Sequence, residues 1–363
     1  MPYDLTLKIS GKRNQNHSLD GHFESKFIDQ SHVTIPPDQI VSGSYTYHED
    51  LLRIQSIQGH LEPIQFSGDI ALNLREQKVI GSVLHLDIAD LTFLKEFFNI
   101  PLAGGLKTNL TSFGPFNHLQ NEMNLSGNHI SIQDKNLGNL SSQISFLVDD
   151  NRIEGHGIMD AFYNQIRFKA DTLFNWEKER VHLTNTRADF GNTRVEGELI
   201  YHLNHQLVEG SMEAAAEDTS ILRSLFNIDL FDSKEIQLQL DLSNNELLNQ
   251  IATFTISTTQ ASYNDVRAEK VILAGKVEDL FRIPQAHLSI KAQQAWVKGW
   301  LLTELTAESF IDQNKDLWPY KVHALSPLNN DLILNTEGAW HYKADTLSIQ
   351  CDKLEGMIKS HPF

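Results

Sequence analysis

Residues that could perform acid–base or metal chemistry are abundant in this chain, but they are scattered. The sequence has 16 histidines and 47 aspartates and glutamates, yet it has no HExxH, GxSxG, GxGxxG, CxxC or phosphate-binding glycine loop. His202 and His205 lie in the segment Tyr-His-Leu-Asn-His, where a solvated turn is a simpler interpretation than a metal site. We therefore predict that the protein is not an enzyme and that it binds no metal or cofactor.

Two aspartates, Asp90 and Asp218, have surroundings that recur along the chain. Each precedes apolar residues at helical spacing, over residues 91–98 and 220–226. An aspartate in that position can accept hydrogen bonds from the first turn of a helix. Both are therefore predicted to be helix N-caps and not catalytic acids. Each helix of about two turns must pack on a larger element to be stable.

The segments around these caps belong to a long internal repeat. Residues 90–102 align with residues 218–230 without a gap, and a third copy begins at Gly338, which matches Gly43. The pattern predicts one continuous repeated region, with units at about residues 43–171 and 172–337 and a truncated third unit from residue 338. Because the third copy stops early, the sequence predicts a fragment or one product of a split gene.

Composition narrows the classes of partner. The chain of 363 residues has a net charge of −17, which argues against nucleic acid and against adsorption to anionic lipid headgroups. It does not argue against binding of uncharged acyl chains. Cys351 is the only cysteine, so no internal disulfide can form. No apolar run approaches the roughly 20 residues of a membrane-spanning helix, and the start of the sequence does not read as a signal peptide.

Strict alternation of apolar and polar residues dominates the sequence, and residues 236–242 show it most clearly. Roughly twenty such segments, joined by short turns, predict an all-β protein. We expect an elongated antiparallel sheet that curls into a groove, with a few short helices. Alternation would place one set of side chains on the apolar inner face. The predicted groove residues are Ile70, Leu72, Leu74, Leu84, Leu86, Ile88, Leu199, Tyr201, Leu203, Ile236, Leu238, Leu240 and Leu242.

Several of these segments resemble the TamB/AsmA-like proteins of the Gram-negative envelope, which are relatives of the bridge-like lipid-transfer proteins. Residues 81–94 lead into residues 99–114 and look like the family's unit of a strand, a short "DL..L" helix and a "G.L....L.G" strand. Residues 210–242 repeat this unit more loosely. Residues 68–72 and 197–201 look like its "G.l.l" strands.

The resemblance implies a β-taco, which is a long curled sheet with an apolar interior. It implies that acyl chains bind there, and that phospholipid or a related lipid is conducted across the periplasm in outer-membrane biogenesis. It also implies a periplasmic protein with an inner-membrane anchor and an outer-membrane barrel partner, both through regions outside this chain.

Two alternatives remain open. One is a structural or adhesive β-repeat protein of the cell surface or envelope, without lipid transport. A solenoid of that kind normally repeats every 20–30 residues or so, a period that is not found here. The other is an enzyme, such as a carbohydrate-active β-protein, which would need carboxylates that converge in space.

Overall fold

The computed structural model describes most of the chain. The described residues are 3–13, 18–29, 40–61, 63–94, 101–132, 135–163, 166–220, 223, 232–245, 249–279, 284–312, 315, 317–327, 332–343, 346–358 and 361–362. Within them the protein is nearly all β, and helical structure is confined to the 3-10 helix η1 (Leu91–Leu94) and to a turn at Ser220 and Arg223. The predicted fold class, an all-β curled antiparallel sheet with little helix, is confirmed.

The chain divides into two units, Met1–Lys178 and Glu179–Phe363, which are described separately. In unit 1 each strand from β1 to β10 pairs with the next one along the chain, always antiparallel. Its strands are β1 (Tyr3–Arg13), β2 (Leu19–Asp29), β3 (Ile40–His48), β4 (Leu51–Leu61), β5 (Ile64–Asn73), β6 (Lys78–Ile88), β7 (Leu102–Pro115), β8 (His118–Ile132), β9 (Lys135–Asp149), β10 (Arg152–Tyr163) and β11 (Ile166–Glu177).

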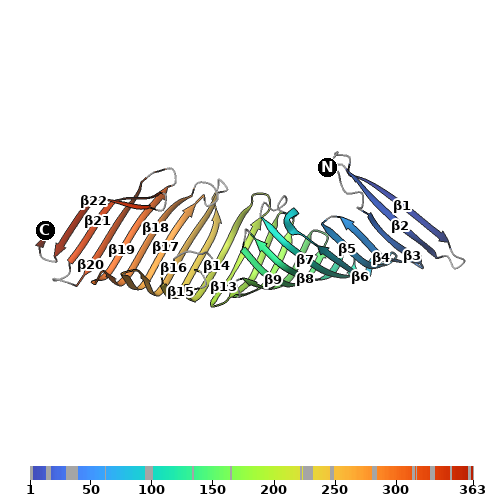
Figure 1. Ribbon diagram of the computed structural model, residues 1–363, viewed down its shortest axis with the longest axis horizontal. Coiled ribbons are helices and arrows are strands. Elements are labelled where there is room, and N and C mark those ends of the chain that lie inside the picture. Colours follow the sequence, from blue (N-terminus) through green and yellow to red (C-terminus); the bar gives the residue numbers. More distant parts are fainter. Residues whose placement is uncertain are drawn as a thin grey trace. The chain divides into compact units, whose positions relative to one another are not determined.

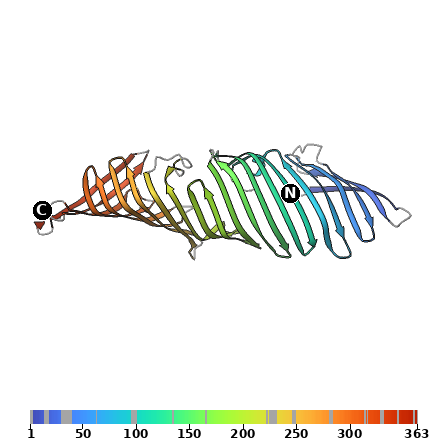
Figure 2. The same ribbon diagram turned by 90° about the horizontal axis from the view of Figure 1, so that it is seen from below.

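Unit 2 follows the same rule from β12 to β23. Its strands are β12 (Arg180–Phe190), β13 (Thr193–His202), β14 (Leu207–Asp218), β15 (Asp232–Asn244), β16 (Gln250–Tyr263), β17 (Val266–Glu278), β18 (Gln285–Val297), β19 (Trp300–Asp312), β20 (Trp318–Ser326), β21 (Leu332–Lys343), β22 (Thr346–Ile358) and β23 (His361–Pro362). Within each unit the strands lie side by side in chain order (Figures 1 and 2).

Bulges bend these sheets and explain why the alternation of the sequence lapses. Glu235 in β15 and Gln294 in β18 have left-handed backbone angles, with φ of 52° and 50°. A bulge residue adds one position to a strand, which increases the local twist and reverses the inside–outside order beyond it. Ala292 and Ala295 are therefore both buried, with 4% and 1% of their surface exposed, although they are three positions apart.

Aromatic side chains lie over glycines of neighbouring strands. The ring of Phe66 covers Gly59, so that a Cβ atom built on Gly59 would lie 2.1–2.7 Å from three ring atoms. Phe254 covers Gly275 in the same manner, and Tyr45 covers Gly21. The glycine leaves room for the ring to lie flat against the sheet, where it shields the backbone and buries its own surface.

The short helices begin as the sequence predicted. Asp90 accepts hydrogen bonds from the backbone N–H of Thr92, at 3.0 Å, and from the Thr92 hydroxyl, at 2.6 Å. Asp218 accepts the corresponding pair from Ser220, with the backbone bond at 2.8 Å. Both aspartates are therefore N-caps, as predicted. Residues 95–98, 221–222 and 224–226 of the two predicted helices lie outside the described residues.

The contact between Phe66 and Gly59 predicts a large effect of a single methyl group. Replacing Gly59 with Ala should lower the free energy of unfolding of unit 1 by about 1–3 kcal/mol, because the ring or the strand must move. Gly81→Ala is the matched control, since no atom lies within 4 Å of a Cβ built there. Denaturant unfolding measures both variants. Equal losses of unfolding free energy in the two variants would show that contact with the Phe66 ring is not what restricts position 59.

The caps predict a dependence of stability on pH. The pKa of Asp90 is lowered, first by the Thr92 hydroxyl and then by the Thr92 backbone N–H. A lowered pKa stabilises the fold above the unfolded-state value of about 3.9, and this contribution disappears as the pH falls through the folded-state value. Asp90→Asn keeps a good capping side chain but removes the charge. Hydrogen exchange of the Thr92 amide should be faster in Asp90→Asn than in the wild type at pH 7, and the difference should shrink as the pH falls below the unfolded-state pKa. A difference that stays constant across this acidic range would exclude the charge as its cause.

Candidate functional site

The candidate functional site is the apolar face of the sheet, and its best-defined part lies in unit 2. Strand pairing places one residue from each strand in a row across the sheet. The row through Leu238 runs from β12 to β20 without a polar side chain, over roughly 40 Å at ~4.8 Å per strand. Its members are Ala188, Val195, Ala214, Leu238, Ile256, Leu273, Ile290, Ala307 and Val322.

Exposure along β15 follows the alternation of its sequence. Leu238, Leu240 and Leu242 are half-buried, whereas Gln237, Gln239 and Asp241 between them are exposed. Each exposed polar residue pairs with a residue on the other face of the sheet, as in Gln239 opposite Thr255. Along β15 the sheet therefore has one half-buried apolar face and one exposed polar face.

The thirteen predicted groove residues fall into three classes of exposure. Ile88 and Ile236 are buried, with 6% and 9% of their surface exposed. Three that lie at or beyond strand ends are exposed, namely Leu74, Tyr201 and Leu203. The others are half-buried, namely Ile70, Leu72, Leu84, Leu86, Leu199, Leu238, Leu240 and Leu242. Pairing places Leu199, Leu238, Leu240 and Leu242 on one face of unit 2.

In unit 1 the corresponding face is partly covered by the chain itself. The row through Leu84 joins Ile57, Gly68, Leu110, Met123, Ile144 and Gly157. Beside it, Leu91 of η1 is 6% exposed and forms a buried cluster with Ile88 and Ile130. Leu86 packs against this cluster. Two of the predicted groove residues, Leu86 and Ile88, therefore contact side chains of the protein's own core.

Some polar residues on the apolar face were missed by the sequence analysis. In unit 1, buried Ser112 donates its hydroxyl to Oδ1 of buried Asn121, at 2.7 Å, and Asn121 Nδ2 donates to the Leu119 carbonyl, at 3.0 Å. The only signal in the sequence is that a polar residue stands where the alternation demands an apolar one. Hydrogen bonds satisfy these groups, so they do not need water.

Gln250 is a buried polar side chain that bridges strands on this face of unit 2, with 2% of its surface exposed. Its Oε1 accepts the Val208 backbone N–H at 2.8 Å, and its Nε2 donates to the Val208 carbonyl at 2.7 Å. The ladder between β14 and β15 begins at Gly210, opposite Leu242. The amide of Gln250 thus satisfies backbone groups of β14 that lie beyond its ladder with β15.

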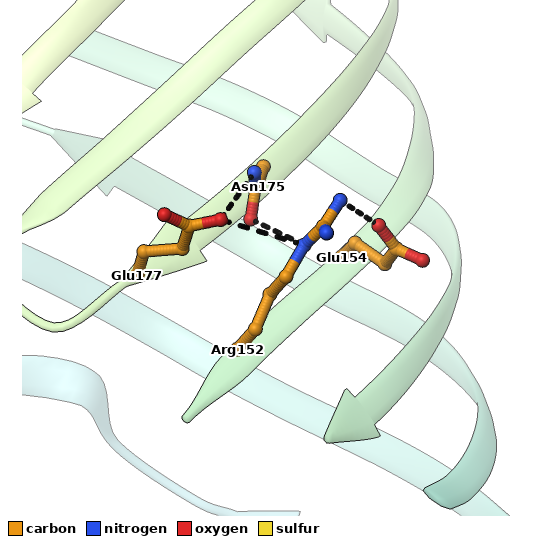
Figure 3. Close-up of polar contacts among 4 residues, drawn as sticks. All are labelled: Arg152, Glu154, Asn175 and Glu177. Carbon is orange, nitrogen blue, oxygen red and sulfur yellow. Dashed lines mark hydrogen bonds and ion pairs between the residues drawn. The ribbon is translucent and has the colours of Figure 1, made fainter. Parts of the chain in front are cut away.

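The opposite face carries charged networks that stay in water. Figure 3 shows Arg152 between Glu154 and Glu177, with Nε of Arg152 donating to Oδ1 of Asn175 at 3.2 Å. Asn175 in turn donates to Glu177 at 3.1 Å. These side chains are about half exposed, and pairs of this kind contribute roughly 0–1 kcal/mol each. Their main effect is to keep this face hydrated.

His202 is better ordered than a solvated turn would suggest. Its side chain is 18% exposed, and Nε2 lies 3.3 Å from a carboxylate oxygen of Glu209. Glu209 also accepts a hydrogen bond from Asn244, at 2.9 Å. Across the described parts of the chain, no group of three or more His, Cys, Asp or Glu residues could hold a metal ion.

The two faces predict different environments for a probe at adjacent positions. In a Cys351→Ser background, Leu240→Cys and Gln239→Cys can each be labelled with an environment-sensitive dye. We expect blue-shifted emission at position 240 and water-like emission at position 239, because the pleat points them to opposite faces. Fluorescence of the two folded conjugates makes the comparison. Identical spectra would mean that the apolar face is as wet as the polar one.

Comparisons with known proteins add no identity. No protein-family model matches the chain, and no curated protein sequence matches it. In the described residues, no helix is both long enough and apolar enough to cross a membrane. The apolar face and the charges around it are therefore the observations from which a function can be inferred.

Proposed function

We propose that the apolar face binds the acyl chains of phospholipid or a related lipid and conducts them along the sheet. In keeping with the sequence resemblance, the proposed setting is the periplasm, where lipid must cross water to reach the outer membrane. The protein performs no covalent chemistry in this scheme. An inner-membrane anchor and an outer-membrane barrel partner belong to the same proposal.

The observation that carries the proposal is an uninterrupted apolar row that no second layer covers among the described residues. Every member of the row is half-buried, so these side chains do not close into a core. Extended apolar surface of this kind typically marks a binding site.

The geometry of the row suggests how a lipid would move. Each CH₂ group of an acyl chain costs about 0.8 kcal/mol when it is exposed to water, so an acyl chain gains free energy by lying on the apolar face. Successive strands present similar apolar residues at ~4.8 Å intervals. Neighbouring positions are therefore similar in energy, and sliding from one to the next exposes little acyl surface. The polar headgroup would stay in water at the edge of the sheet.

A structural β-repeat protein without lipid transport is the second candidate, and one observation favours it. In unit 1, Leu91 of η1 packs on Ile88 and Ile130 and closes part of the apolar face with the protein's own side chains. If the protein's own side chains covered the whole apolar face in this way, that face would be a closed core without room for an acyl chain. The row through Leu238 is the place where the two candidates differ, since Leu238, its member in β15, is half-buried.

Photo-crosslinking at adjacent positions tests the proposal. A photoreactive amino acid at Leu238 should capture lipid from labelled phospholipid vesicles, while one at Gln239 should capture little, because only position 238 faces the apolar row. Mass spectrometry of the adducts gives the yield at each position. A matched pair, Leu238→Arg and Gln239→Arg, then tests conduction in a vesicle-to-vesicle transfer assay.

Leu238→Arg should reduce transfer at least tenfold, because a charge on a dry apolar face is costly to desolvate. Gln239→Arg adds the same charge to the wet face and should transfer lipid at the wild-type rate. Circular dichroism must show that both variants are folded. Capture at neither position in a folded protein, or equal capture at both, would leave the structural candidate standing alone.

A further inference from the structure

A hollow of about 1050 Å³ lies at one edge of unit 2, and it contains none of the predicted groove residues. It is built where strands turn: the ends of β14, β16 and β18, the starts of β15 and β17, and the turns at Asp265 and Gly299. Lys298 N donates to the Asp265 carbonyl at 3.3 Å, which links those two turns. A Cβ built on Gly299 would meet open space, so the hollow is open beside this turn.

Some of the charged side chains in the hollow already form ion pairs or hydrogen bonds within the protein. Arg223 Nη2 lies 2.7 Å from Oδ1 of Asp232, which ties the helical turn to the start of β15. Asp218 caps that turn and also accepts a hydrogen bond from Nδ2 of Asn192, at 3.0 Å. These groups hold the wall of the hollow in place and are not available to a ligand.

Three cations that line the hollow have no ion-pair partner among the described residues: Lys234, Arg267 and Lys298. Within the described residues, none of them has a carboxylate within 4.0 Å. Three other lysines of unit 2, Lys276, Lys321 and Lys353, differ from them because each pairs with a glutamate. Their three side chains could bind an anion by charge-assisted hydrogen bonds.

Two carboxylates in the same hollow also lack an ion-pair partner among the described residues. Asp265 and Glu269 line it and have no ion-pair partner among the described residues. Trp296 lies opposite Arg267 in the ladder of β17 and β18, so an indole ring forms part of the wall. The hollow therefore offers cations, carboxylates and one aromatic surface, a combination that matches a ligand with both charges.

The hollow borders the apolar face. Three small residues that line it, Ser233, Ala261 and Ala268, form one row by strand pairing. The row continues to Ala295, which is 1% exposed, and to Leu302. Successive residues of a strand point to opposite faces, so this row lies on the other face of the sheet from Lys234, Arg267 and Glu269. The residues that line the hollow therefore come from both faces, and a molecule with its polar end among the charges would reach this row around the edge of the sheet.

We propose that this hollow binds a zwitterionic phosphorylated headgroup. The phosphate would contact Lys234, Arg267 and Lys298, and the ammonium group would lie near Asp265 and Glu269. This assignment rests on the proposed lipid-binding function, because it gives the headgroup of a bound lipid a place at the edge of the sheet. A zwitterion satisfies both sets of charges, whereas a simple anion would leave the carboxylates to repel it.

The first experiment uses sn-glycero-3-phosphoethanolamine, a headgroup without acyl chains, as the probe. The full chain should bind it in calorimetry at low ionic strength. Replacing Lys234, Arg267 and Lys298 together with Gln should weaken binding about tenfold, at roughly twofold for each exposed ion pair. The control replaces Lys276, Lys321 and Lys353 with Gln, which removes the same charge from paired lysines. Equal losses in both triple variants, or no binding by the wild type, would overturn the assignment.

The second experiment separates a headgroup site from a site for free phosphate. Wild-type protein should bind the probe more tightly than sn-glycerol 3-phosphate or inorganic phosphate. The double variant Asp265→Asn, Glu269→Gln should lose that preference, because the ammonium no longer finds a carboxylate. Inorganic phosphate binding as tightly as the probe in the wild type would overturn the zwitterionic assignment.

Capture of lipid at position 238 distinguishes failure of this site from failure of the lipid function. Wild-type protein that captures acyl chains there but does not bind the probe refutes the headgroup site alone. Probe binding without capture at position 238 refutes the lipid function and leaves the hollow as a site for small soluble zwitterions. Thermal unfolding of each variant confirms that the fold is intact.

Discussion

The constraint on which this structure depends is that a single layer of antiparallel strands has one apolar face and no second layer to cover it. Pairing with chain neighbours satisfies the backbone groups of each interior strand, so the sheet itself can grow without limit. Strand pairing does not bury the apolar side chains, and each Å² of apolar surface left in water costs about 25 cal/mol. Each unit reduces that cost locally, and the devices that do so give the face its form.

Three devices are visible. Bulges at residues such as Glu235 and Gln294 twist the strands and turn small side chains inward on both sides of the bend. Aromatic rings lie flat over glycines, as Phe254 does over Gly275, and cover apolar backbone without needing a facing layer. In unit 1 a helical turn places Leu91 on the sheet. None of these fully buries the row through Leu238, which is why that row is the candidate site.

The polar groups are arranged by the same constraint. Charged residues fill the wet face and pair with one another, as Arg152 does with Glu154 and Glu177. Polar residues that do fall on the apolar face find hydrogen bonds within the sheet, as Gln250 does with the backbone of Val208. The hollow at the edge of unit 2 gathers three cations, Lys234, Arg267 and Lys298, that have no carboxylate partner in the described part of the chain. Unpaired charge beside an apolar face is the arrangement that an amphipathic ligand requires.

The sequence by itself determined the class of fold, the faces of the strands and the helix caps. These follow from local rules: alternation in residues 236–242 specifies a two-faced strand, and Asp90 and Asp218 each bond the turn that begins beside them. The repeat boundaries, the lipid function and the periplasmic setting remain predictions. Tertiary structure alone decided the bulges, the cover over Leu86 and Ile88, and the hollow. A bulge depends on which residues of a neighbouring strand accept its hydrogen bonds, and the hollow collects side chains from residues 218 to 299 across several strands. A local pattern of apolar and polar residues does not contain that information, because it is fixed only when register is set between strands.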